Sequence, residues 1–126
     1  MANKKLSEHF TLEEFACRCG CGEADADPRL IASLEALREA VHAPIHINSG
    51  RRCEKQNKKV GGSPNSQHLT GKAADIWMEN VTPQEIARQA AEIEAFRKGG
   101  IGVYPSFVHL DVRPNGPARW GLKWRD

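Results

Sequence analysis

The segment 107–113, with the sequence FVHLDVR, constrains the fold of this chain more than any other. Successive side chains of a β-strand point to opposite faces of the sheet. As a strand, this segment therefore turns three apolar side chains to one face, namely Val108, Leu110 and Val112. The opposite face carries Phe107, His109, Asp111 and Arg113. Such a strand belongs to a sheet that buries one face against a second layer and keeps the other face polar.

The rest of the chain predicts that the second layer is helical. Asp27-Pro28 is typical of a helix N-terminus, and apolar residues follow it at helical spacing: Leu30, Ile31, Leu34, Leu37 and Val41. A second long helix is expected from Thr82-Pro83 to the glycines at 99–100, and a short helix is expected near Leu12. Alternating segments predict strands at 45–48, 73–78, 101–104, 107–113 and 119–124. We expect an α+β fold, with two helices packed on a small antiparallel sheet, as a single domain over residues 1–126.

The composition excludes several classes of protein. Eighteen basic and sixteen acidic residues leave a net charge of +2, which is too small an excess for a general nucleic-acid binder. No apolar run approaches the roughly 18 residues that a membrane span requires, so no membrane insertion is expected. The first ten residues, MANKKLSEHF, have no apolar stretch behind their lysines. We therefore expect a monomer that is synthesised in the cytoplasm without a signal peptide.

Two polar regions do not fit the helix and strand pattern. Residues 50–67 form a long segment rich in Arg, Lys, Asn, Ser and Gly, which predicts an active-site loop, and residues 1–10 are expected to form an N-terminal arm. The cysteines are Cys17, Cys19 and Cys21, which crowd into five residues, and the distant Cys53. Their C-x-C-x-C spacing lacks the C-x-x-C loop of ordinary zinc knuckles. Free thiols in a tight turn are the main expectation, with a structural zinc site or a disulfide to Cys53 as alternatives.

Two histidines and an aspartate are candidate metal ligands. His68 and Asp75 lie seven residues apart, and His109 lies on the polar face of the predicted strand. Such a set suits catalytic zinc, which activates a water molecule in its open position. Asp111 is then the expected general base. Two other interpretations stay open: Asp111 as a ligand with Asp75 orienting an imidazole, and the two aspartates as the carboxylate pair of a glycosidase that works without metal.

The motif that joins these residues resembles that of a known family. Its parts are Ser66-x-His68-x-x-Gly71-x-Ala73-x-Asp75, the strand that contains His109, the segment NSGRR at 48–52, and the segment FTLEEF at 10–15 with the cysteines behind it. They resemble the zinc D-Ala-D-Ala carboxypeptidases and their phage endolysin relatives. That family shares its fold with lysostaphin-type endopeptidases and the hedgehog signalling domain. The resemblance covers nearly the whole chain and implies a hedgehog/D-Ala-D-Ala peptidase-like fold.

The resemblance implies roles for particular residues. His68, Asp75 and His109 would be the zinc ligands, and Arg52 would bind the carboxylate of the substrate or polarise its carbonyl group. Ser66 and Gln67 would help to bind the substrate. Better-known branches of the family carry a catalytic glutamate three residues before the second histidine, where this chain has Ser106. Asp111 is the expected substitute.

The resemblance also implies a substrate. The expected activity is that of a metallopeptidase that hydrolyses stem peptides of peptidoglycan, as a D-Ala-D-Ala carboxypeptidase or as an L,D- or D,D-endopeptidase. It would act at the cell wall, after release from the cell or as part of a phage particle. The alternative is a non-catalytic, zinc-containing module of the same fold that binds the wall or belongs to a phage tail. Trp120 and Trp124 are expected to fill the core rather than to form a substrate platform.

Overall fold

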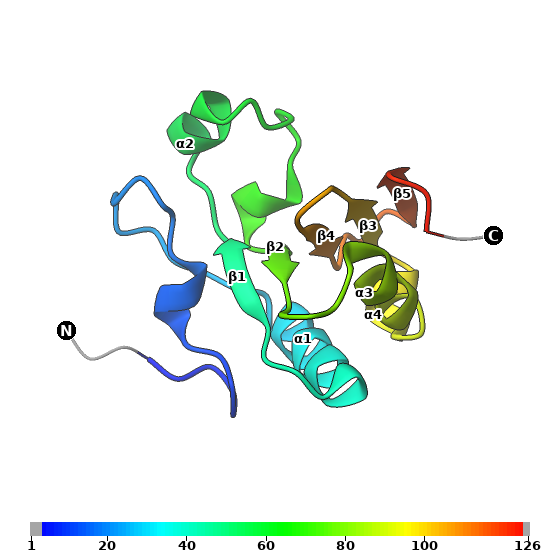
Figure 1. The fold of residues 1–126 in the computed structure, drawn as a ribbon. Coiled ribbons are helices and arrows are strands. Elements are labelled where there is room, and N and C mark those ends of the chain that lie inside the picture. Colours follow the sequence, from blue (N-terminus) through cyan, green and yellow to red (C-terminus); the bar gives the residue numbers. More distant parts are fainter. Residues whose placement is uncertain (1–3, 125–126) are drawn as a thin grey trace.

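The centre of the protein is a five-stranded sheet (Figure 1). A computed structural model describes residues 4–124. The strands are β1 (His46–Ser49), β2 (Ala73–Trp77), β3 (Gly100–Val103), β4 (Val108–Asp111) and β5 (Ala118–Gly121). They are arranged in the order β1-β2-β4-β3-β5, and every neighbouring pair is antiparallel except β3 and β5, which are parallel. The expectation of a wholly antiparallel sheet was wrong at this edge, because the connection after β4 carries the chain across β3 before β5 begins.

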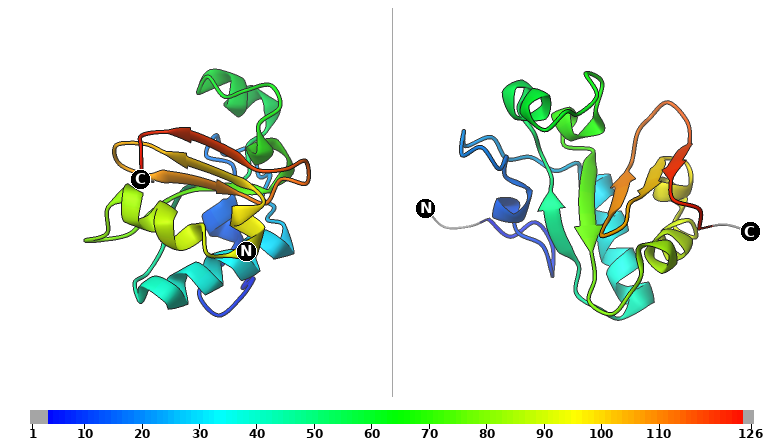
Figure 2. Two further views of the ribbon diagram at one scale, coloured as in Figure 1. Left: turned by 90° about the vertical axis from the view of Figure 1, so that its right-hand side faces the viewer. Right: turned by 45° about the horizontal axis from the view of Figure 1, so that its top comes forward.

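Helices cover one face of the sheet and leave the other to the candidate site. Figure 2 shows α1 (Pro28–Val41), α3 (Pro83–Ala90) and α4 (Glu94–Arg97) on one side, and α2 (Glu54–Lys59) on the opposite side. Two short 3-10 helices, η1 (Leu12–Phe15) and η2 (Gln67–Thr70), complete the fold. None of the helices in residues 4–124 has the length and apolar character needed to cross a membrane. The predicted α+β class is confirmed.

The helices begin where their capping residues predict. The Asp27 side chain accepts a hydrogen bond from the backbone N–H of Arg29, and the Thr82 side chain accepts one from Glu85. The second predicted helix is interrupted, because the backbone is extended at Ile93 (φ −95°, ψ 121°) and α4 starts afterwards. This break separates α3 from α4, whose Phe96 is fully buried in the core.

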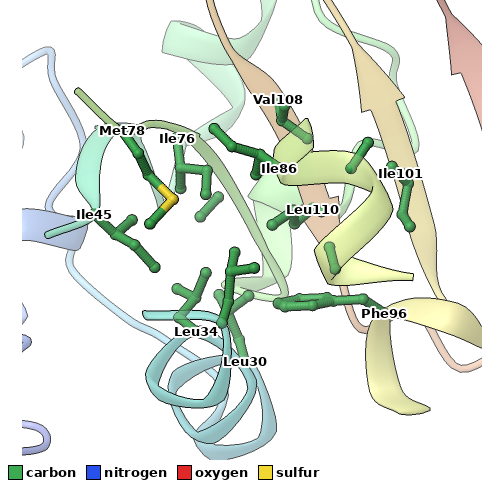
Figure 3. Close-up of a cluster of buried hydrophobic side chains, with 14 of the residues drawn as sticks. Leu30, Leu34, Ile45, Ile76, Met78, Ile86, Phe96, Ile101, Val108 and Leu110 are labelled. Atoms are coloured by element: carbon green, nitrogen blue, oxygen red, sulfur yellow. The ribbon is translucent and has the colours of Figure 1, made fainter. Parts of the chain in front are cut away.

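The core lies between the sheet and the three helices that cover it (Figure 3). Its members come from α1, α3, α4 and all the central strands, and include Leu30, Leu34, Ile76, Met78, Ile86, Phe96, Ile101, Val108 and Leu110. Val112 is also buried here, so the predicted core face of the segment 107–113 is confirmed. Each CH₂ group removed from water contributes about 0.8 kcal/mol, so this single apolar layer is the main force that holds the strands in place.

The polar segment 50–67 has a structure of its own. It contains α2, which the sequence did not predict because the helix has no apolar face. Its centre is the buried side chain of Asn57, which donates a hydrogen bond to the carbonyl oxygen of Ser63 at 2.8 Å and accepts one from Arg52 at 3.1 Å. A buried amide with both groups paired favours one conformation of the segment. The backbone around Arg52 is thereby fixed beside the sheet.

Candidate metal centre

One row of residues crosses all five strands on the face opposite the helices. The register pairs Ser49 with Asp75, Asp75 with His109, His109 with Gly102, and Gly102 with Trp120. Paired residues on neighbouring strands share a face of the sheet and lie side by side. The row therefore places a carboxylate next to an imidazole at the middle of the sheet, where the backbone is held by hydrogen bonds on both sides.

His68 reaches this row from η2. The Ser66 hydroxyl accepts a hydrogen bond from the His68 backbone N–H at 3.2 Å and caps the short helix. Nε2 of His68 and Nδ1 of His109 each lie 3.1 Å from the same oxygen of Asp75, Oδ1. All three residues are buried: His68 is 2% exposed, Asp75 is 7% exposed and His109 is 8% exposed. Their candidate ligand atoms all lie within 4.8 Å of one another.

The remaining nitrogen of each imidazole has an acceptor of its own. Nδ1 of His68 lies 2.7 Å from the carbonyl oxygen of Gly50, and Nε2 of His109 lies 2.8 Å from a carboxylate oxygen of Asp111. Each acceptor holds the proton on the nitrogen that faces it, so the lone pair of a neutral imidazole turns toward Asp75. Two nitrogen lone pairs and a carboxylate oxygen then converge on one point. This donor set fits a zinc ion.

Both aspartates are ionised in this environment. Burial alone raises the pKa of Asp75, but its side-chain interactions with His109 and His68 lower that pKa far below its usual range. Burial has the same effect on the pKa of Asp111, and hydrogen bonds from His109 and Arg113 overcome it there. For His109, burial lowers the pKa, while Asp111 and Asp75 raise it above its usual value. Asp75 therefore offers an ionised carboxylate to a cation, and Asp111 offers one to His109.

Asp111 lies behind His109 and away from the cleft. Its side chain has no exposed area. Besides His109, its oxygens accept hydrogen bonds from the backbone N–H of Gly100 at 2.8 Å and from Nε and Nη2 of Arg113 at 2.9 and 2.7 Å. The expected role of general base does not fit this position, because the carboxylate reaches neither solvent nor a substrate. It fits instead a group that orients the imidazole of His109.

The same positions correct two alternative interpretations. Asp75, rather than Asp111, lies between the two histidines. The interpretation in which Asp111 is the metal ligand and Asp75 orients an imidazole therefore does not fit the structure. A glycosidase pair also needs one carboxyl group whose raised pKa keeps it protonated, and both carboxylates facing the glycosidic bond. Here the pKa of each aspartate is lowered, and His109 stands between them.

Arg52 fixes the other oxygen of Asp75. Its Nη2 lies 3.2 Å from Oδ2 of Asp75, its Nη1 lies 3.1 Å from Oδ1 of Asn57, and its Nε lies 3.3 Å from Oγ of Ser49. The backbone N–H of Arg52 also donates to the carbonyl oxygen of His68 at 2.9 Å. A guanidinium has five N–H donors in a rigid plane, so these contacts set the orientation of Asp75 and leave donors for a further group.

A cleft of about 620 Å³ opens above the row. Arg52, Ser66 and Gln67 line one side of it, and Tyr104, Arg113 and Trp120 line the other. The indole N–H of Trp120 donates to the Tyr104 hydroxyl at 2.9 Å, and its ring centre lies 5.0 Å from that of His109. The indole lies directly over Gly102, where a Cβ would come within 2.3 Å of the ring. Trp120 was expected in the core, which is wrong, whereas the same expectation is confirmed for Trp124.

Comparison with known proteins identifies the family. The family model described as Peptidase M15 matches residues 8–111, which include every residue of the metal centre. The chain belongs to the Peptidase M15 family. The resemblance to the zinc D-Ala-D-Ala carboxypeptidase-type family is confirmed over most of the chain. No curated protein matched the chain in a sequence search.

Most of the predicted site residues of this M15 protein lie together in the structure. His68, Asp75 and His109 come together as a metal site requires, and Arg52, Ser66 and Gln67 line the same cleft. The segment 102–104 is part of the family resemblance, but the sequence indicated no role for Gly102 or Tyr104. The place of Gly102 beneath Trp120 depends on the parallel pairing of β3 and β5.

Proposed function

We propose that this M15 protein is a zinc-dependent peptidase that hydrolyses peptide bonds in the stem peptides of peptidoglycan. One observation carries the proposal: Nε2 of His68, Nδ1 of His109 and Oδ1 of Asp75 converge at the base of an open cleft. When bound there, zinc lowers the pKa of a water molecule to near neutrality and polarises a carbonyl group. Amide hydrolysis needs both this activated water and this polarised carbonyl group.

The protein contributes orientation. The Gly50 carbonyl oxygen and the Asp111 carboxylate keep the protons of His68 and His109 on the nitrogens that face away from the cleft. Both imidazoles then direct a nitrogen to the ion without having to turn. Arg52 holds Asp75 from the opposite side and prevents its carboxylate from rotating. A centre organised in this way costs little reorganisation when a substrate arrives.

The cleft provides contacts that suit an anionic peptide. Arg52 and Arg113 both border it, and Asp75 is the only carboxylate among the described residues that do. The N–H donors of Arg52 that other side chains leave open suit the carboxylate or the carbonyl oxygen of a substrate. Ser66 and Gln67 add polar groups on the same side, and Trp120 adds an aromatic surface. The free carboxylates of stem peptides match the positive charge of the two arginines. We therefore propose that the reaction takes place at the cell wall, after release of the protein from the cell or as part of a phage particle.

A second function has one specific observation in its favour. Asp111 is fully engaged behind His109, and the residue three positions before His109 is Ser106. Within residues 4–124, the cleft therefore has no carboxylate free to act as a base. A protein that keeps zinc but has lost hydrolysis would look like this. It would be a zinc-containing module that binds the wall or belongs to a phage tail.

Digestion of purified peptidoglycan separates the two functions. The protein, incubated with wall fragments of several compositions, should release products that mass spectrometry assigns to a single type of peptide bond. A chelator should stop the release, and added zinc should restore it. Sedimentation with intact walls, without cleavage of any fragment, would contradict the peptidase and support the binding module.

A further inference from the structure

A second cluster of candidate ligands lies outside the cleft. The four cysteines gather their sulfur atoms within 4.8 Å of one another, although Cys53 is more than thirty residues distant from the others in the sequence. The Sγ–Sγ distances are 3.5 Å between Cys17 and Cys19, 3.7 Å between Cys17 and Cys53, and 3.7 Å between Cys19 and Cys53. All four are free thiols. The thiols are free, as expected, and the distant Cys53 joins the other three in one compact group.

We propose that Cys17, Cys19, Cys21 and Cys53 bind a structural zinc ion, separate from the centre in the cleft. Four thiolates around zinc, with Zn–S bonds of about 2.3 Å, place neighbouring sulfurs about 3.8 Å apart in a tetrahedron. The three distances between Cys17, Cys19 and Cys53 already match that edge, and Cys21 lies within reach. Disulfides would need pairs of sulfurs much closer together. The cluster thus has the shape of a tetrahedral metal site.

The local backbone explains how so tight a spacing can surround one ion. The loop is closed by an antiparallel bridge between Ala16 and Ala24 and by a hydrogen bond from the Cys17 N–H to the Glu23 carbonyl oxygen at 2.8 Å. Inside the loop, Gly20 and Gly22 have φ angles of 83° and 90°. This left-handed region is open to glycine and strained for other residues. The two glycines let the backbone turn tightly. The short C-x-C-x-C segment can therefore direct its sulfurs to one point, as a C-x-x-C loop usually does.

Backbone N–H groups point at two of the four sulfur atoms. The backbone N–H of Cys53 donates to Sγ of Cys17 at 3.4 Å, and the backbone N–H of Gln56 donates to Sγ of Cys53 at 3.4 Å. Such bonds stabilise thiolates that bind a metal. A zinc ion with four thiolates carries two net negative charges, and Lys55 and Lys59 line the same surface hollow as three of the cysteines. Their positive charges offset part of that excess.

The proposed ion would connect two segments that position the cleft. Cys53 caps α2 and directly follows Arg52, whose side chain holds Asp75 and whose N–H holds the His68 carbonyl oxygen. Zinc at the cysteines would anchor this segment to the loop 17–23. The ion would be structural, because four protein ligands leave it no open position for a substrate. The inference does not depend on whether the cleft hydrolyses peptides.

Cobalt substitution of the metal-free wild-type protein tests the proposal directly. Cobalt(II) bound to thiolates gives an intense charge-transfer band in the near ultraviolet, together with the d–d bands of tetrahedral coordination. The wild-type protein should show both, and elemental analysis of the zinc form should find two equivalents of zinc. His68→Ala should lose one equivalent and keep the thiolate band. Cys53→Ser should lose the band and keep the other equivalent.

Cys53→Ser is a matched variant because a serine hydroxyl can still cap α2 while it replaces a zinc ligand. Cys21→Ser at an exposed position provides a second variant that disturbs no core packing. Chelation should also increase the rate at which the four thiols react with a thiol reagent by at least tenfold, since thiolates bound to a metal are protected. Absence of a thiolate band in the cobalt-loaded wild-type protein, or fewer than four free thiols under denaturing conditions, would overturn the proposal. Neither result would affect the peptidase proposal.

Discussion

The two ligand clusters of this protein differ in what holds them in place. His109 and Asp75 belong to central strands, and each side chain is fixed by a second partner, Asp111 and Arg52 respectively. The cysteines lie on a short loop and at the start of a six-residue helix, where two sulfurs are exposed and the sulfurs mainly contact one another. If both clusters bind zinc as proposed, the sheet would hold its ligands in place without the ion, whereas the loop would depend on the ion to fix its sulfurs. A metal can therefore serve catalysis in one region and folding in the other.

Removal of a histidine from the candidate metal centre should have the largest effect. His68→Ala or His109→Ala should lower peptide cleavage by about a thousandfold, because bound metal supplies several kcal/mol of transition-state stabilisation. Zinc analysis should show the loss of one equivalent, and circular dichroism should show that the fold is retained. A variant that keeps full activity without this zinc would place the chemistry elsewhere.

Asp111→Asn should have the next largest effect. A group that orients a metal-bound histidine typically changes metal affinity by about 10–100-fold when it is replaced. We expect zinc to bind more weakly by this factor, while turnover at saturating zinc falls much less. Competition with a chelating dye measures the affinity, and Glu35→Gln, which neutralises a carboxylate bonded to His9, is the control. Unchanged affinity with lost turnover would instead restore Asp111 as the base.

Removal of metal by a chelator should increase hydrogen exchange in the cysteine cluster more than in the sheet. Without metal, amides of residues 17–23 and 50–57 should exchange hydrogen at least about tenfold faster, because local stability there depends on an ion. Amides of β2 and β4 should change much less, since the sheet ladder holds them. Hydrogen-exchange mass spectrometry with and without chelator measures both. Equal acceleration in the two regions would remove the distinction between them.

The smallest effect should be an acid sensitivity of the metal-free protein. The pKa of Asp111, which faces His109 and Arg113, lies well below its ordinary value of 3.8 in the folded state. Its ionised form therefore stabilises the fold above that ordinary value, and this contribution is lost as the pH falls below it. Between about pH 5 and pH 3, the wild-type Tm should fall a few degrees more than that of Asp111→Asn. Parallel Tm curves in chelator would show that Asp111 contributes nothing to stability.

The sequence revealed the two faces of the strand 107–113 and the starts of the helices. It did not reveal how deeply each polar side chain is buried or which remote segments lie in contact. The alternation in 107–113 correctly separated the core residues from His109 and Asp111, because the period of a strand is a local property. That alternation cannot show which polar side chain opens to a cleft and which is covered by Arg113. The convergence of Cys53 with the cysteine loop, and of Trp120 with Gly102, depends on contacts between remote segments. Such contacts leave no periodic signal.

The place of β5 at the edge, parallel to β3, has a consequence for biosynthesis. On the ribosome, His68, Asp75 and His109 all emerge before β5, which is the last strand of the sheet. The wall that Trp120 adds to the cleft can form only after β3 and β4 have been synthesised. A nascent chain could thus acquire its ion first and its ability to hold a peptide last.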